Sequence, residues 1–116
     1  IYSNRVFFIQ KKDIEVYADL SYKKVWPLYE AWGCSILGLF SSLSFEHHHE
    51  IKLFAGYKSI AHWEETRNLT GARPDVIDNK IWEEGRNAVF ERANLTLASN
   101  VSLMRKVYLH NNEQAE

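Results

Sequence analysis

The chain has 116 residues and a formal net charge of −1 at pH 7. Its 46% of hydrophobic and 25% of charged residues are typical of a folded globular domain, which excludes disordered and fibrous proteins. No run of Lys or Arg is longer than a pair, and no segment approaches the roughly 20 apolar residues that span a bilayer, so neither nucleic acid nor a membrane is an expected partner.

The first predicted elements are a strand and a long helix. Residues 2–9 are aromatic and β-branched, which favours a strand, and Asp13 could then cap a helix. Apolar residues follow at three- and four-residue steps, namely Ile14, Tyr17, Ala18, Val25, Leu28, Tyr29 and Trp32. Pro27 should kink this helix or restart it near Val25, and Gly33 should end it.

A β-hairpin is expected next. Residues 34–43 and 48–57 have strand character, and the serines at positions 41, 42 and 44 lie at the turn between them. Ser59 is then a suitable N-cap for a helix over residues 60–69.

A last helix and a last strand complete the chain. The helix should begin at Asp75 or Asp78 and reach about residue 98, with one apolar side formed by Ile77, Ile81, Val89, Ala93 and Leu97. Residues 101–110 are predicted to be a strand, and residues 111–116 a polar tail.

This order of elements predicts the fold class. Strand, helix, strand, strand, helices, strand is the split βαβ pattern of an α+β, ferredoxin-like domain, in which a four-stranded antiparallel sheet carries its helices on one face. We therefore expect a single domain over residues 1–110.

The other face of the sheet should be apolar. Alternation along the strands places several large side chains on the face that the helices cannot cover, namely Phe7, Ile9, Ile36, Phe40 and Phe54. Because such a surface is unfavourable in water, the sequence predicts a homodimer in which two sheets pack face to face.

Three groups of residues resemble the NIPSNAP family. Residues 4–9 (Asn-Arg-Val-Phe-Phe-Ile), with Tyr17 eight residues later, are similar to the family's first strand and helix. Residues 26–33 (Trp-Pro-Leu-Tyr-Glu-Ala-Trp-Gly) and 37–40 (Leu-Gly-Leu-Phe) resemble its Pro-containing helix end and second strand. Residues 57–67 (Tyr-Lys-Ser-Ile-Ala-His-Trp-Glu-Glu-Thr-Arg) resemble its Tyr-x-Ser-Leu-Ala segment.

The resemblance implies a dimeric α+β barrel, in which paired sheets enclose a cleft. It implies little about the reaction, because this scaffold carries cofactor-independent oxygenases, lyases, cyclases and haem-binding proteins.

The adjacent histidines His47, His48 and His49 permit two interpretations. On a strand, His47 and His49 would share one face and could chelate zinc or copper with a third ligand. That ligand could come from Glu46, Glu50 or His110. A solvated hairpin turn whose imidazoles titrate near neutral pH explains the cluster equally simply, and we favour it, so no metal is predicted.

Two histidines are candidate general bases. His48 at the mouth of the sheet, or His62 on the first turn of the second helix, could take a proton from a bound substrate. The single cysteine, Cys34, excludes a disulfide within the chain and fits a reducing, cytoplasmic location. It has no adjacent helix N-terminus that would lower its thiol pKa, so it is not expected to be a nucleophile.

An arginine in the first strand is the principal candidate for ligand binding. Arg5, flanked by apolar residues, must meet an anion or reach the edge of the sheet, and its planar fork could hold a carboxylate, phenolate or enolate. A structural ion pair is the alternative. Arg67 and Arg105 could act in the same way, although both positions could be exposed. Among the tryptophans, Trp63 and Trp82 adjoin charged residues and are the better candidates for a pocket or an interface.

Together these features predict a homodimeric, NIPSNAP-like protein that binds a small, partly aromatic or polyketide-like molecule in a cleft between sheet and helices. Phe7, Phe40 and Phe54 would supply contact area and Arg5 would orient a polar group. As an enzyme it would perform acid-base chemistry such as isomerisation, cyclisation or cofactor-free oxygenation. No motif predicts a bound cofactor. The alternative is a non-catalytic dimeric interaction module.

Overall fold

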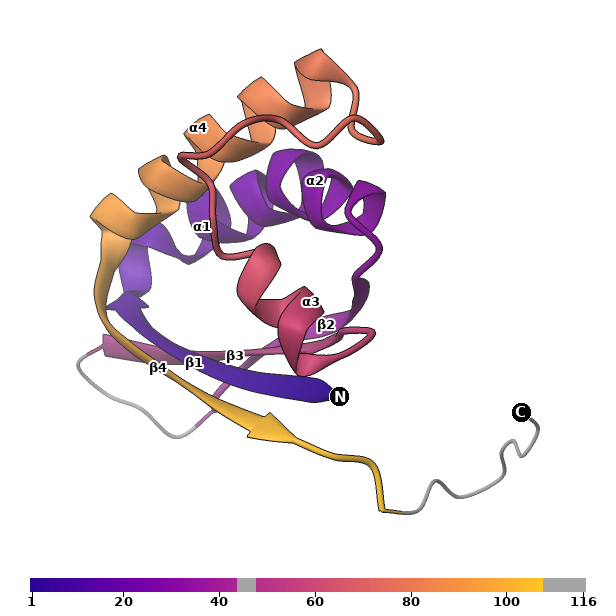
Figure 1. Ribbon diagram of the computed structural model, residues 1–116. Coiled ribbons are helices and arrows are strands. Elements are labelled where there is room, and N and C mark those ends of the chain that lie inside the picture. Colours follow the sequence, from indigo (N-terminus) through magenta and orange to yellow (C-terminus); the bar gives the residue numbers. More distant parts are fainter. Residues whose placement is uncertain (44–47, 108–116) are drawn as a thin grey trace.

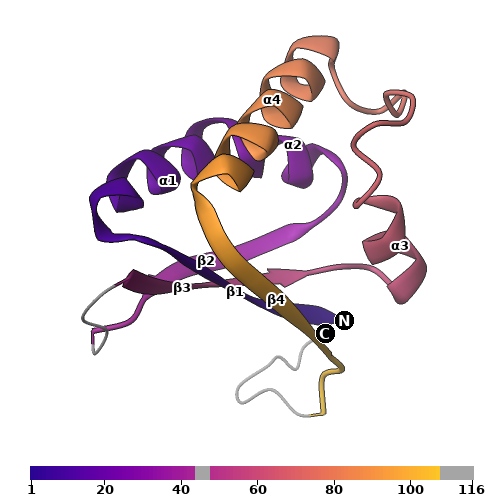
Figure 2. The ribbon, with the colours of Figure 1, turned by 90° about the vertical axis from the view of Figure 1, so that its left-hand side faces the viewer.

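The computed structural model describes residues 1–43 and 48–107. Four strands form one antiparallel sheet in the order β2-β3-β1-β4. The helices lie on one face of this sheet (Figures 1 and 2). The chain therefore has the α+β, ferredoxin-like architecture that the order of its elements predicts.

The strands are β1 Tyr2–Gln10, β2 Ser35–Ser41, β3 His48–Gly56 and β4 Thr96–Met104. Central β1 pairs with β3 on one side and β4 on the other, so that Arg5 lies opposite both Leu53 and Val101. The predicted hairpin is confirmed, since β2 and β3 pair along their length.

The helical layer consists of α1 Ile14–Leu20, α2 Trp26–Ala31, α3 Ile60–Glu65 and α4 Asn79–Leu95, with a 3₁₀ turn, η1 Lys11–Asp13, before α1. A π-helical segment, η2 Ser21–Val25, joins α1 to α2. Pro27 occupies the start of α2, where its missing N–H is tolerated, so the predicted restart of the helix near Val25 is confirmed. Gly33 ends this helical stretch with a positive φ of 92°, as expected.

The predicted helix caps are confirmed at two of three positions. The Ser59 hydroxyl accepts a hydrogen bond from the His62 main-chain N–H (3.0 Å), and the Asp78 carboxylate accepts one from that of Lys80 (3.0 Å). Asp13 makes no capping hydrogen bond, and its carboxylate instead contacts the neighbouring Lys12. The prediction for Asp13 is therefore wrong.

Three boundaries also differ from the prediction. Helix α3 ends at Glu65, where the Thr66 hydroxyl donates to the Trp63 carbonyl. Strand β4 begins at Thr96, directly after α4, because Thr96 already has extended backbone angles. Leu97 thus belongs to the strand and not to the helix. β4 ends at Met104, and the predicted polar tail lies outside the described residues.

The covered face of the sheet carries residues that were expected on the bare face. Phe7 and Ile9 are only 6% and 0% exposed, and the Phe7 ring packs 5.3 Å from that of Tyr17 in α1. Ile36 also faces the space between the layers. The prediction is wrong for these three residues because the apolar stripe of the first helix covers their side of the sheet.

The bare face carries Phe40 and Phe54, as predicted. Their strand neighbours Leu39 and Leu53 pack toward the helices, so alternation turns both phenylalanines to the opposite face. The two rings meet edge to face at 5.7 Å, and Phe40 remains 55% exposed. No helix of the described residues covers them (Figure 2).

The buried core has two parts. One joins α2 to α4 and comprises Leu28, Trp32, Leu69, Ile77 and Trp82. The other joins the sheet to α1 and comprises Phe7, Ile9, Tyr17 and Ile51. None of the helices in the described part of the chain combines the length and apolar character needed to cross a bilayer.

Candidate functional site

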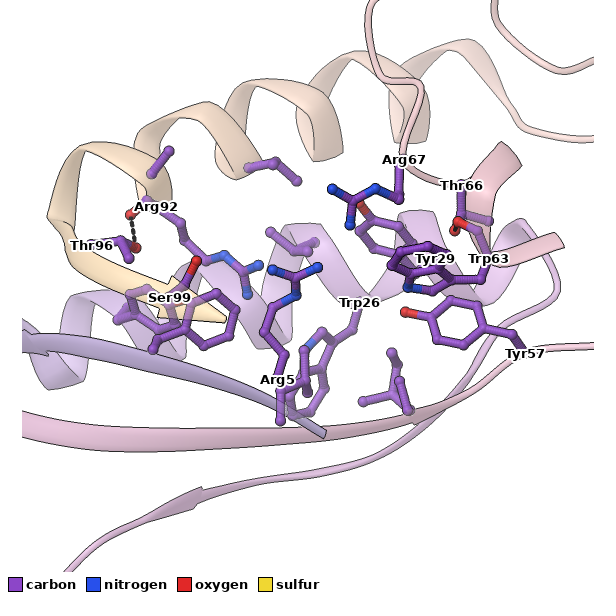
Figure 3. Close-up of a pocket in the computed structure, with 18 of the residues that line it drawn as sticks. Arg5, Trp26, Tyr29, Tyr57, Trp63, Thr66, Arg67, Arg92, Thr96 and Ser99 are labelled. Atoms are coloured by element: carbon purple, nitrogen blue, oxygen red, sulfur yellow. Dashed lines mark hydrogen bonds between the residues drawn. The ribbon is translucent and has the colours of Figure 1, made fainter. Parts of the chain in front are cut away.

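A cavity of about 480 Å³ lies between the sheet and the helices, beside the two parts of the core. All four strands contribute to its floor, and α1, η2, α2, α4 and the end of α3 form its walls (Figure 3). Its volume falls in the range of roughly 300 to 1,000 Å³ that small-molecule sites occupy.

Three arginines from different elements line the cavity. Arg5 comes from the middle of β1, Arg67 follows α3, and Arg92 belongs to the last turns of α4. Their guanidinium groups point into the cavity (Figure 3). Among the described residues, none of the three pairs with a carboxylate, and no Asp or Glu lines the cavity. The site is therefore positively charged.

Arg92 is the most deeply placed of the three. Its side chain is buried, with only 8% of the residue exposed, and its guanidinium lies over the rings of Phe7 (5.4 Å) and Tyr17 (5.0 Å). Its Nη1 donates a hydrogen bond to the Ser21 hydroxyl (2.8 Å), but its Nε has no partner among the described residues. Burial of a charge with an unused donor is unfavourable unless something else satisfies it.

The Ser21 hydroxyl is oriented so that it can accept a hydrogen bond from Arg92. The Ser21 hydroxyl donates its proton to the Tyr17 carbonyl (2.8 Å), so its lone pairs remain to accept from Arg92. Ser21 opens the π-helical segment η2, and such segments often occur at functional sites. The same segment continues into Val25 and Trp26, which line the cavity.

Arg5 also has no carboxylate counter-ion among the described residues. Burial lowers the pKa of Arg5 below its ordinary value, and the positive charge of Arg67 lowers it further. Its guanidinium lies 6.0 Å from the centre of the Phe7 ring, on which Arg92 also packs. An arginine remains charged at neutral pH, so Arg5 and Arg67 are two like charges close enough to influence each other.

Neutral hydrogen-bond donors complete the lining. Burial raises the pKa values of Tyr17 and Tyr57 and raises that of Tyr29 to about 12, so all three phenols keep their protons at neutral pH. Among the described residues, the Trp26 Nε1 has no hydrogen-bond partner. The Tyr17 hydroxyl lies beside that of Thr96, which acts against the effect of burial on the Tyr17 pKa, and the Thr96 hydroxyl donates to the Arg92 carbonyl. The indole N–H of Trp26 can therefore donate to a bound molecule.

The opposite end of the cavity is formed by Trp63 and Arg67. The Arg67 guanidinium lies 4.6 Å from the centre of the Trp63 ring, close enough for a cation–π interaction. Buried Thr66 donates to the Trp63 carbonyl and fixes this turn of backbone. Arg67 is exposed, so this end is open to solvent.

Four of the predicted ligand-binding residues lie together in this cavity, namely Arg5, Phe7, Trp63 and Arg67. Phe40 and Phe54 do not line it, because they lie on the opposite face of the sheet. Trp82 also lies elsewhere. It is 2% exposed and packs edge to face on Trp32 at 5.4 Å, so it is a core residue and the predicted role in a pocket is wrong.

The predicted base His62 does not line the cavity, and both of its ring nitrogens are engaged. His62 accepts from the Lys58 main-chain N–H at Nδ1 (3.0 Å) and donates from Nε2 to the Trp32 carbonyl (2.8 Å). With both ring nitrogens engaged, it has none free for proton transfer. The side chain of His48 lies outside the described residues, so its role stays a prediction.

The histidine cluster forms no complete metal site within the described residues. Nowhere in them do three or more His, Cys, Asp or Glu side chains come together. Glu46, His47 and His110, which the metal interpretation also needs, lie outside them.

Sequence analysis did not identify Arg92, Trp26 or the three tyrosines as site residues. The sequence does contain a signal that could have identified Arg92. This residue lies seven residues after Gly85 and four after Ala88, on the buried side of α4, where a charged residue is unexpected. The tyrosines carry no such signal, because an aromatic residue at a helical or strand period indicates a core position.

The described lining offers donors of several kinds but no evident proton acceptor. Its polar side chains are guanidinium, phenol, indole and aliphatic hydroxyl groups, with no carboxylate, imidazole or amine. The arrangement can bind and polarise an anion. It provides no group that would exchange a proton near neutral pH.

Comparisons with known proteins show the fold. No family model matches the chain, and no curated protein matches its sequence. A NIPSNAP family protein from Agrobacterium tumefaciens superposes with a TM-score of 0.65 at 15% identity, covering 92% of this chain and 93% of that one. A NIPSNAP domain protein from Burkholderia xenovorans gives 0.66 at 9% identity, covering 95% and 98%.

A third structure has a dimeric form. A dimeric ferredoxin-like protein from an uncultured marine organism superposes with a TM-score of 0.54 at 11% identity, covering 95% of this chain and 92% of that one. At these identities the likeness is one of fold. The chain thus shares the fold of NIPSNAP structures, which confirms at the level of fold the resemblance seen in its sequence.

Proposed function

We propose that this chain, which has the fold of NIPSNAP structures, is a NIPSNAP-like protein that binds a small molecule with a flat apolar body and an anionic group in the cavity between its sheet and its helices. The observation that carries the proposal is the set of three arginines that line this cavity, with no carboxylate to pair them among the described residues. A ligand anion would supply the missing charge.

The walls favour a flat and partly aromatic body. Phe7, Trp26, Tyr29 and Trp63 present rings to the cavity, and Ile36 and Leu53 add aliphatic surface. Planar ligands pack well on such rings, while the phenol and indole donors can meet carbonyl or hydroxyl oxygens. An aromatic or polyketide-like acid combines both properties.

Binding is better supported than acid-base catalysis. An isomerase or cyclase of the predicted kind needs a proton acceptor beside its substrate, and the described lining holds none. The cavity also argues against a pure interaction module. If the cleft served only packing, its own aromatic residues would fill it, whereas a volume of about 480 Å³ remains.

We further propose that the chain forms a homodimer through the bare face of the sheet. Phe40 and Leu37 are 55% and 57% exposed there, and one neighbour in fold is described as dimeric. Isolated apolar residues are common on protein surfaces, but an aromatic pair on an uncovered sheet is typical of an interface.

The proposal is tested by isothermal titration calorimetry with 2-naphthoate, a planar carboxylate. Replacement of Arg5 by Ala should weaken binding by at least about tenfold, because it removes a charge-assisted hydrogen bond, while the melting temperature stays within about 2 °C. Arg105→Ala is the matched control, since Arg105 is exposed and outside the cavity.

A different outcome would make Arg5 structural. If Arg5→Ala lowered the melting temperature strongly and left the affinity for 2-naphthoate unchanged, the guanidinium would serve packing of β1 and not a ligand. Loss of binding in Arg105→Ala as well would indicate non-specific attraction to positive charge.

A further inference from the structure

The three guanidinium groups of the cavity converge. Arg5 extends from β1, Arg92 from α4 and Arg67 from the segment after α3, and their guanidinium groups point toward one another (Figure 3). Those of Arg5 and Arg92 lie over the same ring, at 6.0 and 5.4 Å from the centre of Phe7. Arg67 is near enough to Arg5 for its charge to lower the Arg5 pKa. Three separate elements thus supply one cationic centre.

Such a centre is unfavourable without a counter-charge. Like charges repel, and partial burial strengthens the repulsion because water screens it less. Among the described residues no carboxylate pairs with any of the three arginines, and Arg92 donates to a neutral hydroxyl, that of Ser21. Contacts with Ser21, Phe7 and Tyr17 nonetheless hold its guanidinium in place. A monoanion would offset one of the three charges and a dianion two, so the charge balance favours a dianion.

The directions of the donors favour a tetrahedral anion over a carboxylate. A carboxylate offers two oxygens in one plane, and the fork of a single arginine can engage both. A phosphate monoester offers three terminal oxygens that point in different directions, and its charge at neutral pH is roughly −1.5 to −2. Clusters of arginines commonly bind such groups in proteins. Three guanidinium groups from three elements match three oxygens better than two.

We infer that the anionic group of the ligand is a single tetrahedral group with two negative charges, a phosphate monoester or a phosphonate, held jointly by Arg5, Arg67 and Arg92. This inference rests on the proposed function and specifies the acidic group of its ligand. The flat body of the ligand packs on the neighbouring rings, such as those of Phe7 and Trp26, which line the same cavity.

The test compares three probes that share a naphthyl ring in calorimetric titrations of the whole protein. 2-Naphthyl phosphate carries a tetrahedral dianion, naphthalene-2-sulfonate a tetrahedral monoanion and 2-naphthoate a planar monoanion. At about pH 7.5 we expect the phosphate to bind at least about tenfold more tightly than either of the others, through its additional charge. Inorganic phosphate, which has no ring, should bind at least about tenfold more weakly than 2-naphthyl phosphate.

A lower pH removes the second charge of the phosphate and leaves the charge of the sulfonate unchanged. The second pKa of a phosphate monoester is about 6, so at about pH 5 both probes are mainly monoanions. The ratio of their affinities should therefore shrink by at least about threefold between about pH 7.5 and about pH 5. An effect of pH on the protein itself acts on both probes and cancels in this ratio.

Substitutions test whether the arginines act on one group. Arg67→Gln and Arg5→Gln should each weaken the binding of 2-naphthyl phosphate by at least about tenfold and that of the sulfonate by less, because a dianion gains more from each positive charge. Arg67→Lys should retain part of the affinity, since it keeps the charge. Arg105→Gln is the matched control and should change neither, because Arg105 is exposed and outside the cavity. Circular dichroism shows whether each variant is folded.

The outcomes separate this inference from the proposed function. If 2-naphthyl phosphate bound no more tightly than the sulfonate or 2-naphthoate, or if Arg67→Gln bound it as the wild type does, the inference would be overturned and the proposed function would stand. Inorganic phosphate that bound as tightly as 2-naphthyl phosphate would also overturn the inference, because the free ion would then be the ligand. If none of the naphthyl anions bound more tightly than uncharged 2-naphthamide, the proposed function itself would fail, and the inference with it.

Discussion

The guanidinium of Arg92 in α4 donates a 2.8 Å hydrogen bond to the hydroxyl of Ser21, which lies 71 positions earlier in the chain. This contact joins the last turns of α4 to the π-helical segment η2, and it orients a buried cation toward the cavity. A short, buried side chain thus determines where a charge of the site lies.

Ser21→Ala should cost stability and weaken binding together. The substitution removes the acceptor for Arg92 Nη1 and leaves a second buried donor of this guanidinium unpaired, for which we expect a loss of about 1 to 3 kcal/mol in the free energy of unfolding. Urea denaturation measures this loss. Ser102→Ala, at an exposed position of β4, is the control and should change stability by less than about 0.5 kcal/mol. A stable Ser21→Ala variant with unchanged affinity for 2-naphthoate would show that Ser21 does not position Arg92.

Gly85→Ala should destabilise the protein although it lies inside a helix. In the interior of a helix, alanine normally stabilises the helix by about 1 kcal/mol relative to glycine. Here an added Cβ would lie 2.6 Å from Leu28 Cβ and 2.8 Å from Leu28 Cδ2, so α2 and α4 would have to move apart. We expect a net loss of about 1 to 3 kcal/mol in urea denaturation.

A matched substitution isolates the steric effect at Gly85. Asn87→Ala, on the exposed side of the same helix, should raise stability by a few tenths of a kcal/mol through helix propensity, roughly the difference between the two residues. If Gly85→Ala also stabilised the protein, the close packing of α4 on α2 would be disproved.

The protein should lose stability at alkaline pH. Burial raises the pKa of the Cys34 thiol from 9.0 to about 12 and that of the Tyr29 phenol from 10.0 to about 12. Between these ordinary values and about 12, the folded protein holds protons that the unfolded chain has released, so the free energy of unfolding falls as pH rises, by up to about 1.4 kcal/mol per pH unit for each group. Below the ordinary values neither group affects the pH dependence.

Urea midpoints at about pH 8 and about pH 11 measure this loss. Cys34→Ala removes one of the two groups, so the free energy of unfolding of this variant should fall less steeply as the pH rises. A thiol reagent should also react slowly with native protein at about pH 8, because the thiol is buried and protonated. Rapid modification of the folded protein, or a pH slope that Cys34→Ala leaves unchanged, would contradict the burial of this thiol.

The proposed dimer depends on the bare face of the sheet. Light scattering should give about twice the chain mass of 13.6 kDa, and Phe40→Asp should give a monomer, because a carboxylate in a sheet-to-sheet interface would be desolvated without a partner. Val76→Asp, at an exposed site remote from the sheet, should leave the mass unchanged. A wild-type monomer at micromolar concentration would refute the dimer.

Much of the fold could be predicted because local signals agree with it. Pro27, Gly33, Ser59 and Asp78 each act within a few residues of their own position, and they mark the ends of helices correctly. The faces of β1 were harder to assign. Both sides of this strand carry aromatic residues, so only the packing of Tyr17 against Phe7 decides which side is covered.

The site could be predicted only in part, because it is assembled from distant segments. Arg5 is conspicuous in its strand, and it lines the cavity. Arg92 becomes a site residue only through its contacts with Ser21, Phe7 and Tyr17, none of which is a neighbour in sequence. His62 shows the opposite case, since its two hydrogen bonds to main-chain groups cannot be foreseen from its neighbours Ala61 and Trp63.

The selectivity of the cavity for an anion is measured most directly by calorimetric titration with 2-naphthoate and with 2-naphthamide, which share a ring system and differ in charge. Three cavity arginines without a carboxylate partner among the described residues predict that the carboxylate binds at least about tenfold more tightly than the amide at low salt. Equal affinities for the two compounds, or tighter binding of the amide, would contradict the proposal that the cavity selects an anion.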